Sequence, residues 1–139
     1  MKISAHVNNS RDSHQVTLKT GENQHSLDIP PRPGGFGSRA NGGELLFLAL
    51  ATCFCNDIYR EAAKRNIVVE RVEVTVEGDF GAEGEPARNV TYHANVAAQA
   101  DREDIQALIR DTDRIAEIHN TLRIATPVTL VDVHAIKAN

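Results

Sequence analysis

The chain has 139 residues, the size of one ordinary domain, and its 41% hydrophobic and 24% charged residues are typical of a soluble globular protein. The net charge of −4 is spread over interspersed acids and bases, so we expect neither nucleic acid nor a membrane surface as a partner. The first residues lack an apolar signal segment, and no stretch approaches the roughly 20 apolar residues of a membrane span. We therefore expect one cytoplasmic domain over residues 1–139.

The first thirty residues show the alternation of short strands. Ile3–Val7, His14–Thr20 and His25–Ile29 are three candidate strands separated by turn residues, which predicts an antiparallel meander. Pro30–Gly37 is too rich in proline and glycine to continue a strand or to start a helix. This segment is therefore predicted to be an ordered loop or a crossover.

Residues Asn41–Arg65 carry the strongest helix pattern in the chain. Asn41 and Glu44 have the spacing of a capping box, in which the first residue and the one three positions later satisfy each other's backbone amides. Leu45–Cys55 is apolar almost all round, which is typical of a helix buried on most sides. After Asp57 the pattern becomes amphipathic, so we expect the helix to begin inside the protein and to end near its surface.

The second half of the chain reads as a hairpin, helices and a last strand. Val68–Phe80 and Asn89–Gln99 alternate apolar and polar residues and predict a long antiparallel hairpin. Helical spacing then runs over residues 101–122, with a break expected near Asp113, and Thr126–Ile136 is predicted to be the final strand. Strands interrupted by helices in this order indicate an α+β fold.

Two cysteines, Cys53 and Cys55, lie in the expected helix. Helix positions two apart point to nearly opposite sides, so we expect neither a disulfide between these thiols nor a shared metal ion. Free cysteines commonly pack as small buried hydrophobes, whereas a thiolate is a nucleophile. Both interpretations stay open for Cys53, while core packing is favoured for Cys55.

The helix pattern also carries a family resemblance. The sequence NGGELLFLALATCF at residues 41–54 resembles the central signature of the OsmC/Ohr superfamily, and the later hairpin and helix match the layout of that family. The resemblance implies an intertwined homodimer in which antiparallel sheets enclose the two long central helices, with active sites at the subunit interface. An all-round apolar helix in a chain of this length fits such an arrangement.

The resemblance assigns roles to particular residues. It implies that Cys53 attacks an organic hydroperoxide, that Arg11 stabilises the reacting sulfur, and that Glu44 holds Arg11. The family's second, resolving cysteine falls near Ala116, so it is absent from this chain. An external thiol reductant would then have to complete a one-cysteine cycle.

Two further residues are candidates near Cys53. His119 lies one helical turn after Ala116 and, if it faces the same pocket, could act as a base or as a cation beside the thiol. Its alternative role is that of a surface or hydrogen-bonded histidine. Asp57 lies one turn after Cys53 and would oppose thiolate formation, so we interpret it as a structural hydrogen-bonding group or a surface charge.

The functional prediction is thus a thiol-dependent peroxidase of organic hydroperoxides that uses Cys53 in a one-cysteine cycle. The alternative is a non-catalytic protein that binds a small apolar ligand at the dimer interface. A thiol–imidazole acyl-transfer enzyme built on Cys53 and His119 is the third hypothesis. The sequence contains no phosphate-binding loop and no zinc motif, so we expect no cofactor and no metal.

Overall fold

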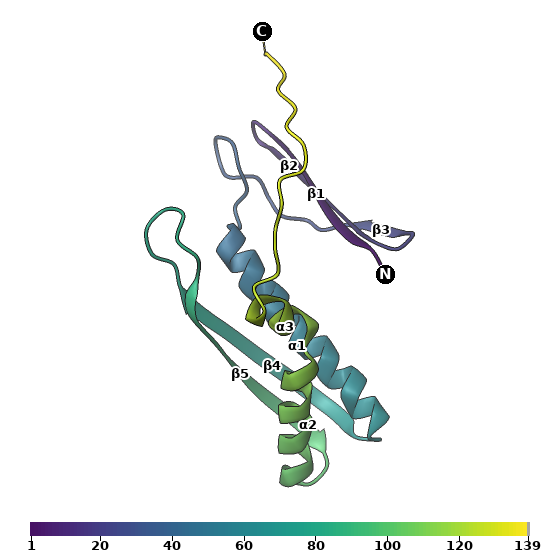
Figure 1. Ribbon diagram of the computed structural model, residues 1–139. Helices are drawn as coiled ribbons and strands as arrows, with labels where there is room; N and C mark the ends of the chain where they lie inside the picture. The colour runs from purple at the N-terminus through teal and green to yellow at the C-terminus, as the bar shows by residue number, and fades with distance from the viewer. Residues whose placement is uncertain (139) are drawn as a thin grey trace. The chain divides into compact units, whose positions relative to one another are not determined.

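Two antiparallel sheets and three helices make up the computed structural model, which describes residues 1–138 (Figure 1). This confirms the predicted α+β class. The chain divides into two units, the first formed by Met1–Leu48 and Phe80–Ala87, and the second formed by Ala49–Asp79 and the chain from Arg88 onward.

The first unit contains the predicted meander, although its third strand begins two residues and ends three residues earlier than predicted. Strands β1 (Ile3–Ser10), β2 (Ser13–Thr20) and β3 (Asn23–Ser26) pair antiparallel in the order β1-β2-β3. The turns between them place Asp12 and Gly21 at positive φ, which both residues tolerate in tight turns. The loop predicted at Pro30–Gly37 is confirmed, since its backbone is irregular except for one isolated bridge between Pro31 and Ser38.

The first unit covers little of its own apolar surface. Val16 and Ile29 are its buried apolar side chains, whereas Ile3 and Val7 on β1 are more than half exposed. Clustered exposed apolar side chains of this kind are characteristic of surfaces that contact another molecule.

Helix α1 spans Gly42–Lys64, within one residue of the predicted bounds. Its first turn contains the predicted capping box. The backbone N–H of Glu44 donates to Asn41 Oδ1 at 2.8 Å, and the N–H of Asn41 donates to Glu44 Oε1 at 2.9 Å. No helix among residues 1–138 is both long enough and apolar enough to cross a lipid bilayer.

The burial of α1 differs from the prediction. A stripe at four-residue spacing, Leu50, Phe54, Ile58 and Ala62, is buried, whereas Leu48 near the start of the helix is 55% exposed. The expectation that the helix begins inside the protein is therefore wrong for the single chain, whereas its end at Ala63 and Lys64 is exposed as predicted. The reason is that the packing partners of α1 in the second unit lie along its later turns.

Those partners include the predicted hairpin. Strands β4 (Val68–Asp79) and β5 (Arg88–Gln99) pair antiparallel, and in Figure 1 the part of α1 from Ala49 onward runs along this hairpin. The core of the second unit joins Phe54, Ile58 and Ala62 of α1 to Leu108 and Ala116. Packed against this core are apolar side chains of the hairpin and its neighbours: Ile67, Val69, Val72, Val74, Tyr92, Ala94, Val96 and Ile109.

Two helices follow the hairpin. Helix α2 spans Arg102–Ile115 and helix α3 spans Glu117–Arg123, with extended backbone at Ala116 between them. The break therefore comes three residues later than Asp113, where it was predicted. Ala116 is fully buried, so the junction is held in the core rather than at the surface.

The final predicted strand, Thr126–Ile136, is not formed. This segment forms neither a strand nor a helix, and its apolar side chains are almost fully exposed. The alternation of residue types was read correctly as strand-like, but a strand requires a neighbour that pairs with its backbone, and residues 1–138 of a single chain supply none to this segment.

Candidate functional site

The thiol of Cys53 lies between two carboxylates. Cys53 and Asp57 are one turn apart on α1, and Sγ donates to Asp57 Oδ2 at 3.5 Å. The first residue of α3, Glu117, places its Oε2 3.9 Å from the same sulfur. The sulfur therefore contacts residues of two helices of the second unit, α1 and α3. Cys53 is half-buried, so part of its side chain remains accessible to solvent.

This environment keeps the thiol protonated. Burial raises the pKa of Cys53, and the negative charges of Asp57 and Glu117 raise it further. A backbone hydrogen bond from Ile118 acts in the opposite direction and stabilises the thiolate. The net pKa is raised, so the resting form at neutral pH is the thiol. The interpretation of Asp57 as a hydrogen-bonding group that opposes thiolate formation agrees with this geometry.

Arg60 binds both carboxylates. Its Nη1 lies 3.1 Å from Asp57 Oδ1 and 3.3 Å from Glu117 Oε1, which ties α1 to α3. Burial, followed by the neighbouring Glu117, raises the pKa of Asp57. The pKa of Glu117 is lowered, first by its own backbone amide and then by Asp57 and Arg60. Asp57 is therefore the carboxyl of the pair that holds a proton more readily.

Among residues 1–138, the side chains of Cys53, Asp57 and Glu117 form the group that could hold a metal ion. One ligand atom each from Cys53, Asp57 and Glu117 lies within 4.8 Å of the others, which is close enough for one divalent cation. Arg60 already binds the two carboxylates there. The group therefore has a cationic partner without a metal ion.

His119 lies in the core against two aromatic rings. It is 5% exposed, with ring centroids 4.7 Å from Tyr92 and 5.7 Å from Phe54. Neither ring nitrogen has a hydrogen-bond partner among residues 1–138, so the thiol and the imidazole do not form a hydrogen-bonded pair. Burial lowers the pKa of His119 and keeps the ring neutral. His119 is thus neither the surface histidine nor the hydrogen-bonded histidine of the alternative interpretation.

A polar network borders this aromatic group. The hydroxyl of Tyr92 donates to Asp113 Oδ1, and Arg123 binds the same carboxylate at 2.7 Å. Burial, together with Asp113, raises the pKa of Tyr92 far above its usual range, so the phenol stays protonated. The network joins β5, α2 and α3 and fixes the segment that carries Glu117.

The other two predicted site residues belong to the first unit. Arg11 lies in the turn between β1 and β2, is 70% exposed and has its guanidinium 3.9 Å from Asp12. Glu44 forms the capping box with Asn41 at the start of α1. The hydrogen bonds of Glu44 thus correspond to its structural role in the helix.

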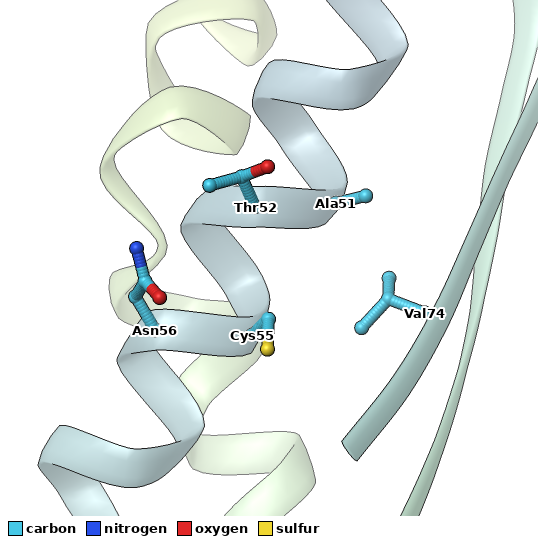
Figure 2. A pocket seen from close by; sticks show the side chains of 5 residues that line it. All are labelled: Ala51, Thr52, Cys55, Asn56 and Val74. Atoms are coloured by element: carbon cyan, nitrogen blue, oxygen red, sulfur yellow. The ribbon is translucent and has the colours of Figure 1, made fainter.

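Cys55 points away from the surroundings of Cys53. It lines a shallow pocket of about 260 Å³ together with Ala51, Thr52, Asn56 and Val74. Figure 2 shows Ala51 and Cys55 on the side of α1 that faces Val74 of β4. Both cysteines are free, as their spacing predicted.

Sequence reasoning missed Arg60 and Glu117. Arg60 could have been found by helical spacing, because it lies three residues after Asp57 and so shares its face. Glu117 follows Ala116, the position that the family resemblance had placed near the reactive sulfur. A glutamate directly after that position was the signal in the sequence that could have indicated a carboxylate near Cys53.

Removing the charge of Asp57 should activate the thiol. In a Cys55→Ser background, we expect Asp57→Asn to lower the pKa of Cys53 and to raise its alkylation rate at pH 7.5 about fivefold, the effect of one unit charge roughly 4 Å away in water. The measurement is the rate of reaction with iodoacetamide between pH 6 and pH 10. Asp104→Asn on α2 is the charge control, and equal rates in the two variants would contradict the assignment.

The buried imidazole predicts an acid-sensitive core. Because the folded state lowers the pKa of His119, this group contributes its full stability above the unfolded value near 6.5, and the contribution is lost as the pH falls toward the folded pKa. The free energy of unfolding of His119→Phe, relative to the wild type, should therefore rise between pH 7.5 and pH 5.5. Urea denaturation at both pH values tests this, and a constant difference would argue against it.

Comparisons with known proteins support the family resemblance. Solved structures similar to this chain include an OsmC-like protein from Mycoplasma pneumoniae, with 23% identity, a TM-score of 0.59, and coverage of 88% of this chain and 86% of the other. An organic hydroperoxide resistance protein OsmC from Legionella pneumophila has 23% identity and a TM-score of 0.58 and covers 88% and 90%. The organic hydroperoxide resistance protein OhrB of Bacillus subtilis has 19% identity and a TM-score of 0.51 and covers 88% and 89%.

These likenesses establish the fold. A comparison with curated protein sequences gave no match. Residues 35–131, more than half of the chain, match the family model of the OsmC-like protein. This matched region contains α1 with Cys53, the hairpin, and helices α2 and α3. The chain therefore belongs to the OsmC-like protein family.

Proposed function

We propose that this protein reduces organic hydroperoxides through Cys53 and that an external thiol completes the cycle. The observation that carries the proposal is the position of Cys53 in an OsmC-like fold, half-buried on α1 and facing the first residues of α3. Two similar structures are organic hydroperoxide resistance proteins, which supports this substrate class.

The chemistry requires a transient thiolate at Cys53. The thiol proton passes to Asp57, which already accepts its hydrogen bond and whose pKa is raised. The thiolate attacks one peroxide oxygen and the O–O bond breaks, which leaves a sulfenic acid on Cys53 and an alkoxide that takes up a proton to become the alcohol. The hydrogen bond from Ile118 stabilises negative charge on the sulfur during this step.

Arg11 and Glu44 complete the proposed machinery. Arg11 would stabilise the thiolate and the developing charge on the peroxide, and Glu44 would orient Arg11. The high exposure of Arg11 leaves its guanidinium available for such a contact. The apolar side chains between Leu45 and Phe54 would favour alkyl and aryl hydroperoxides over hydrogen peroxide.

The absence of a second reactive cysteine at the site supports a one-cysteine cycle. Ala116 is fully buried at the junction of α2 and α3, the region to which the resemblance assigns the resolving cysteine. Cys55 lines a pocket on the side of α1 that faces β4. The sulfenic acid would therefore be reduced by a thiol from solution.

We also propose that the chain acts as a single cytoplasmic OsmC-like domain that forms a homodimer. Leu48 on α1 and the apolar residues of β1 are exposed in the single chain, and such surfaces are normally covered by a partner. The apolar side chains after residue 125 are exposed as well: Val128, Leu130, Val131, Val133 and Ile136. A second copy would cover surface of this extent.

A second candidate function has its own supporting observation. The two carboxylates beside Cys53 raise the pKa of its thiol, which is the opposite of the environment that activates a nucleophilic cysteine. The fold would then serve to bind a small apolar ligand at the dimer interface, with Cys53 as a lining residue. Ligand that copurifies with the protein would favour this function.

Peroxide treatment distinguishes the two functions. One equivalent of cumene hydroperoxide with a dimedone trap should add one sulfenic-acid adduct to wild type and to Cys55→Ser, and none to Cys53→Ser, because only Cys53 lies in the proposed site. Intact-mass spectrometry measures the adduct. A wild-type protein that stays unmodified would exclude the peroxidase and leave the ligand-binding function.

The assembly state tests the proposed partner. Sedimentation equilibrium should give twice the chain mass, and Leu48→Glu should shift the protein toward the monomer, because it places a charge on an exposed apolar position of α1. Gln106→Glu on the exposed face of α2 adds the same charge and serves as the control. A wild-type protein that is monomeric at micromolar concentration would contradict the proposed homodimer.

A further inference from the structure

The carboxylates around Cys53 come from two elements and leave its entrance acidic. Asp57 is almost fully buried on α1, whereas the Glu117 side chain on α3 is 61% exposed. Their oxygens lie 3.5 Å and 3.9 Å from Sγ. Any molecule that touches this sulfur must therefore come within a few ångströms of both oxygens, and the exposed Glu117 faces the solvent from which that molecule arrives.

The positive charge nearby does not balance this group. Arg60 is bound by Asp57 and Glu117 and also lies 3.7 Å from Glu61, while Lys64 pairs with Glu61 at 2.6 Å. The two carboxylates beside the sulfur, Asp57 and Glu117, therefore share one cation, Arg60. The thiol experiences their remaining negative charge, because both Asp57 and Glu117 destabilise negative charge on Cys53.

We propose that Asp57 and Glu117 select the reaction partners of Cys53 by charge, so that the thiol which reduces it is cationic or uncharged and thiols bearing carboxylates are disfavoured. This inference rests on the proposed one-cysteine peroxide reduction. Glu117 is the main specificity-determining residue because it is the exposed member of the pair. At about 4 Å in water, one unit charge changes an encounter by roughly fivefold, and the effect decreases with added salt.

The step that this charge controls follows peroxide reduction. The sulfur of the incoming thiol attacks the sulfur of Cys53, an S–S bond forms, and the S–O bond of the sulfenic acid breaks. The hydroxyl leaves with the thiol proton as water. A second thiol attacks the mixed disulfide, releases the small-molecule disulfide and returns a proton and an electron pair to Cys53. Two thiols thus supply the two electrons that reduce one peroxide.

The charge preference can be measured without peroxide. In a Cys55→Ser background, the reduced protein is treated with methanethiosulfonates that carry either a trimethylammonium or a sulfonate group, and intact mass gives the rate at Cys53. We expect the cationic reagent to react about tenfold faster than the anionic one at low salt, after correction for their rates with a free thiol. In Glu117→Gln this ratio should fall to about threefold or less.

A matched control removes the same charge elsewhere. Glu103→Gln lies in the first turn of α2, more than ten residues before α3, and should keep the ratio of the reference protein. A ratio near one in the reference protein, or an unchanged ratio in Glu117→Gln, would overturn charge selection. The preference should also weaken in 0.5 M salt, and a salt-independent ratio would count against an electrostatic cause.

A second arm separates this inference from the proposed function. Cys53 is oxidised with one equivalent of cumene hydroperoxide, and the recovery of its thiol is followed with cysteamine, 2-mercaptoethanol and 3-mercaptopropionate at equal thiolate concentrations. We expect recovery rates in that order. Failure to form the sulfenic acid would contradict the proposed peroxidase function. A sulfenic acid that all three thiols reduce equally fast would contradict charge selection but would agree with the peroxidase function.

Discussion

The packing of one helical stripe determines where the reactive sulfur lies. Phe54 and Ile58 are fully buried against the core of the second unit, which fixes the rotation of α1 about its axis. Because Cys53 and Asp57 each precede one of these residues, they fall together on the flank of the helix that meets Glu117. A change that loosened Phe54 would therefore disturb the site even though this ring makes no polar contact with the thiol.

The site combines two opposing electrostatic effects on one sulfur. Burial and the two carboxylates favour the neutral thiol, while the hydrogen bond from Ile118 favours the anion. The balance favours the neutral thiol at rest. In the proposed reaction, proton transfer to Asp57 would depend on the charge of Glu117, because the two carboxyl groups interact and share Arg60.

The sequence was sufficient to predict elements that are stabilised by local contacts. The capping box of Asn41 and Glu44 and the β4–β5 hairpin follow from spacing within short stretches. The state of Thr126–Ile136 did not follow, because a strand is defined by its partner and not by its own alternation. The contact of Cys53 with Glu117 joins positions 64 residues apart, and only tertiary packing brings them together. Family resemblance indicated Cys53 as the candidate nucleophile, but it contained no information about the carboxylates.

Alanine at position 116, together with the carboxylates of Asp57 and Glu117, affects which thiol can reduce an oxidised Cys53. A chain with a resolving cysteine at this junction would reduce its sulfenic acid internally, and the charge of outside thiols would matter only at the later disulfide. In the one-cysteine cycle proposed for this chain, the outside thiol would have to reach Cys53 itself, so the charge of Glu117 would act on the first reductive step. In the proposed cycle, the absence of a cysteine at Ala116 would therefore place the control of specificity on electrostatics instead of covalent geometry. The exposed position of Glu117 makes that control sensitive to ionic strength.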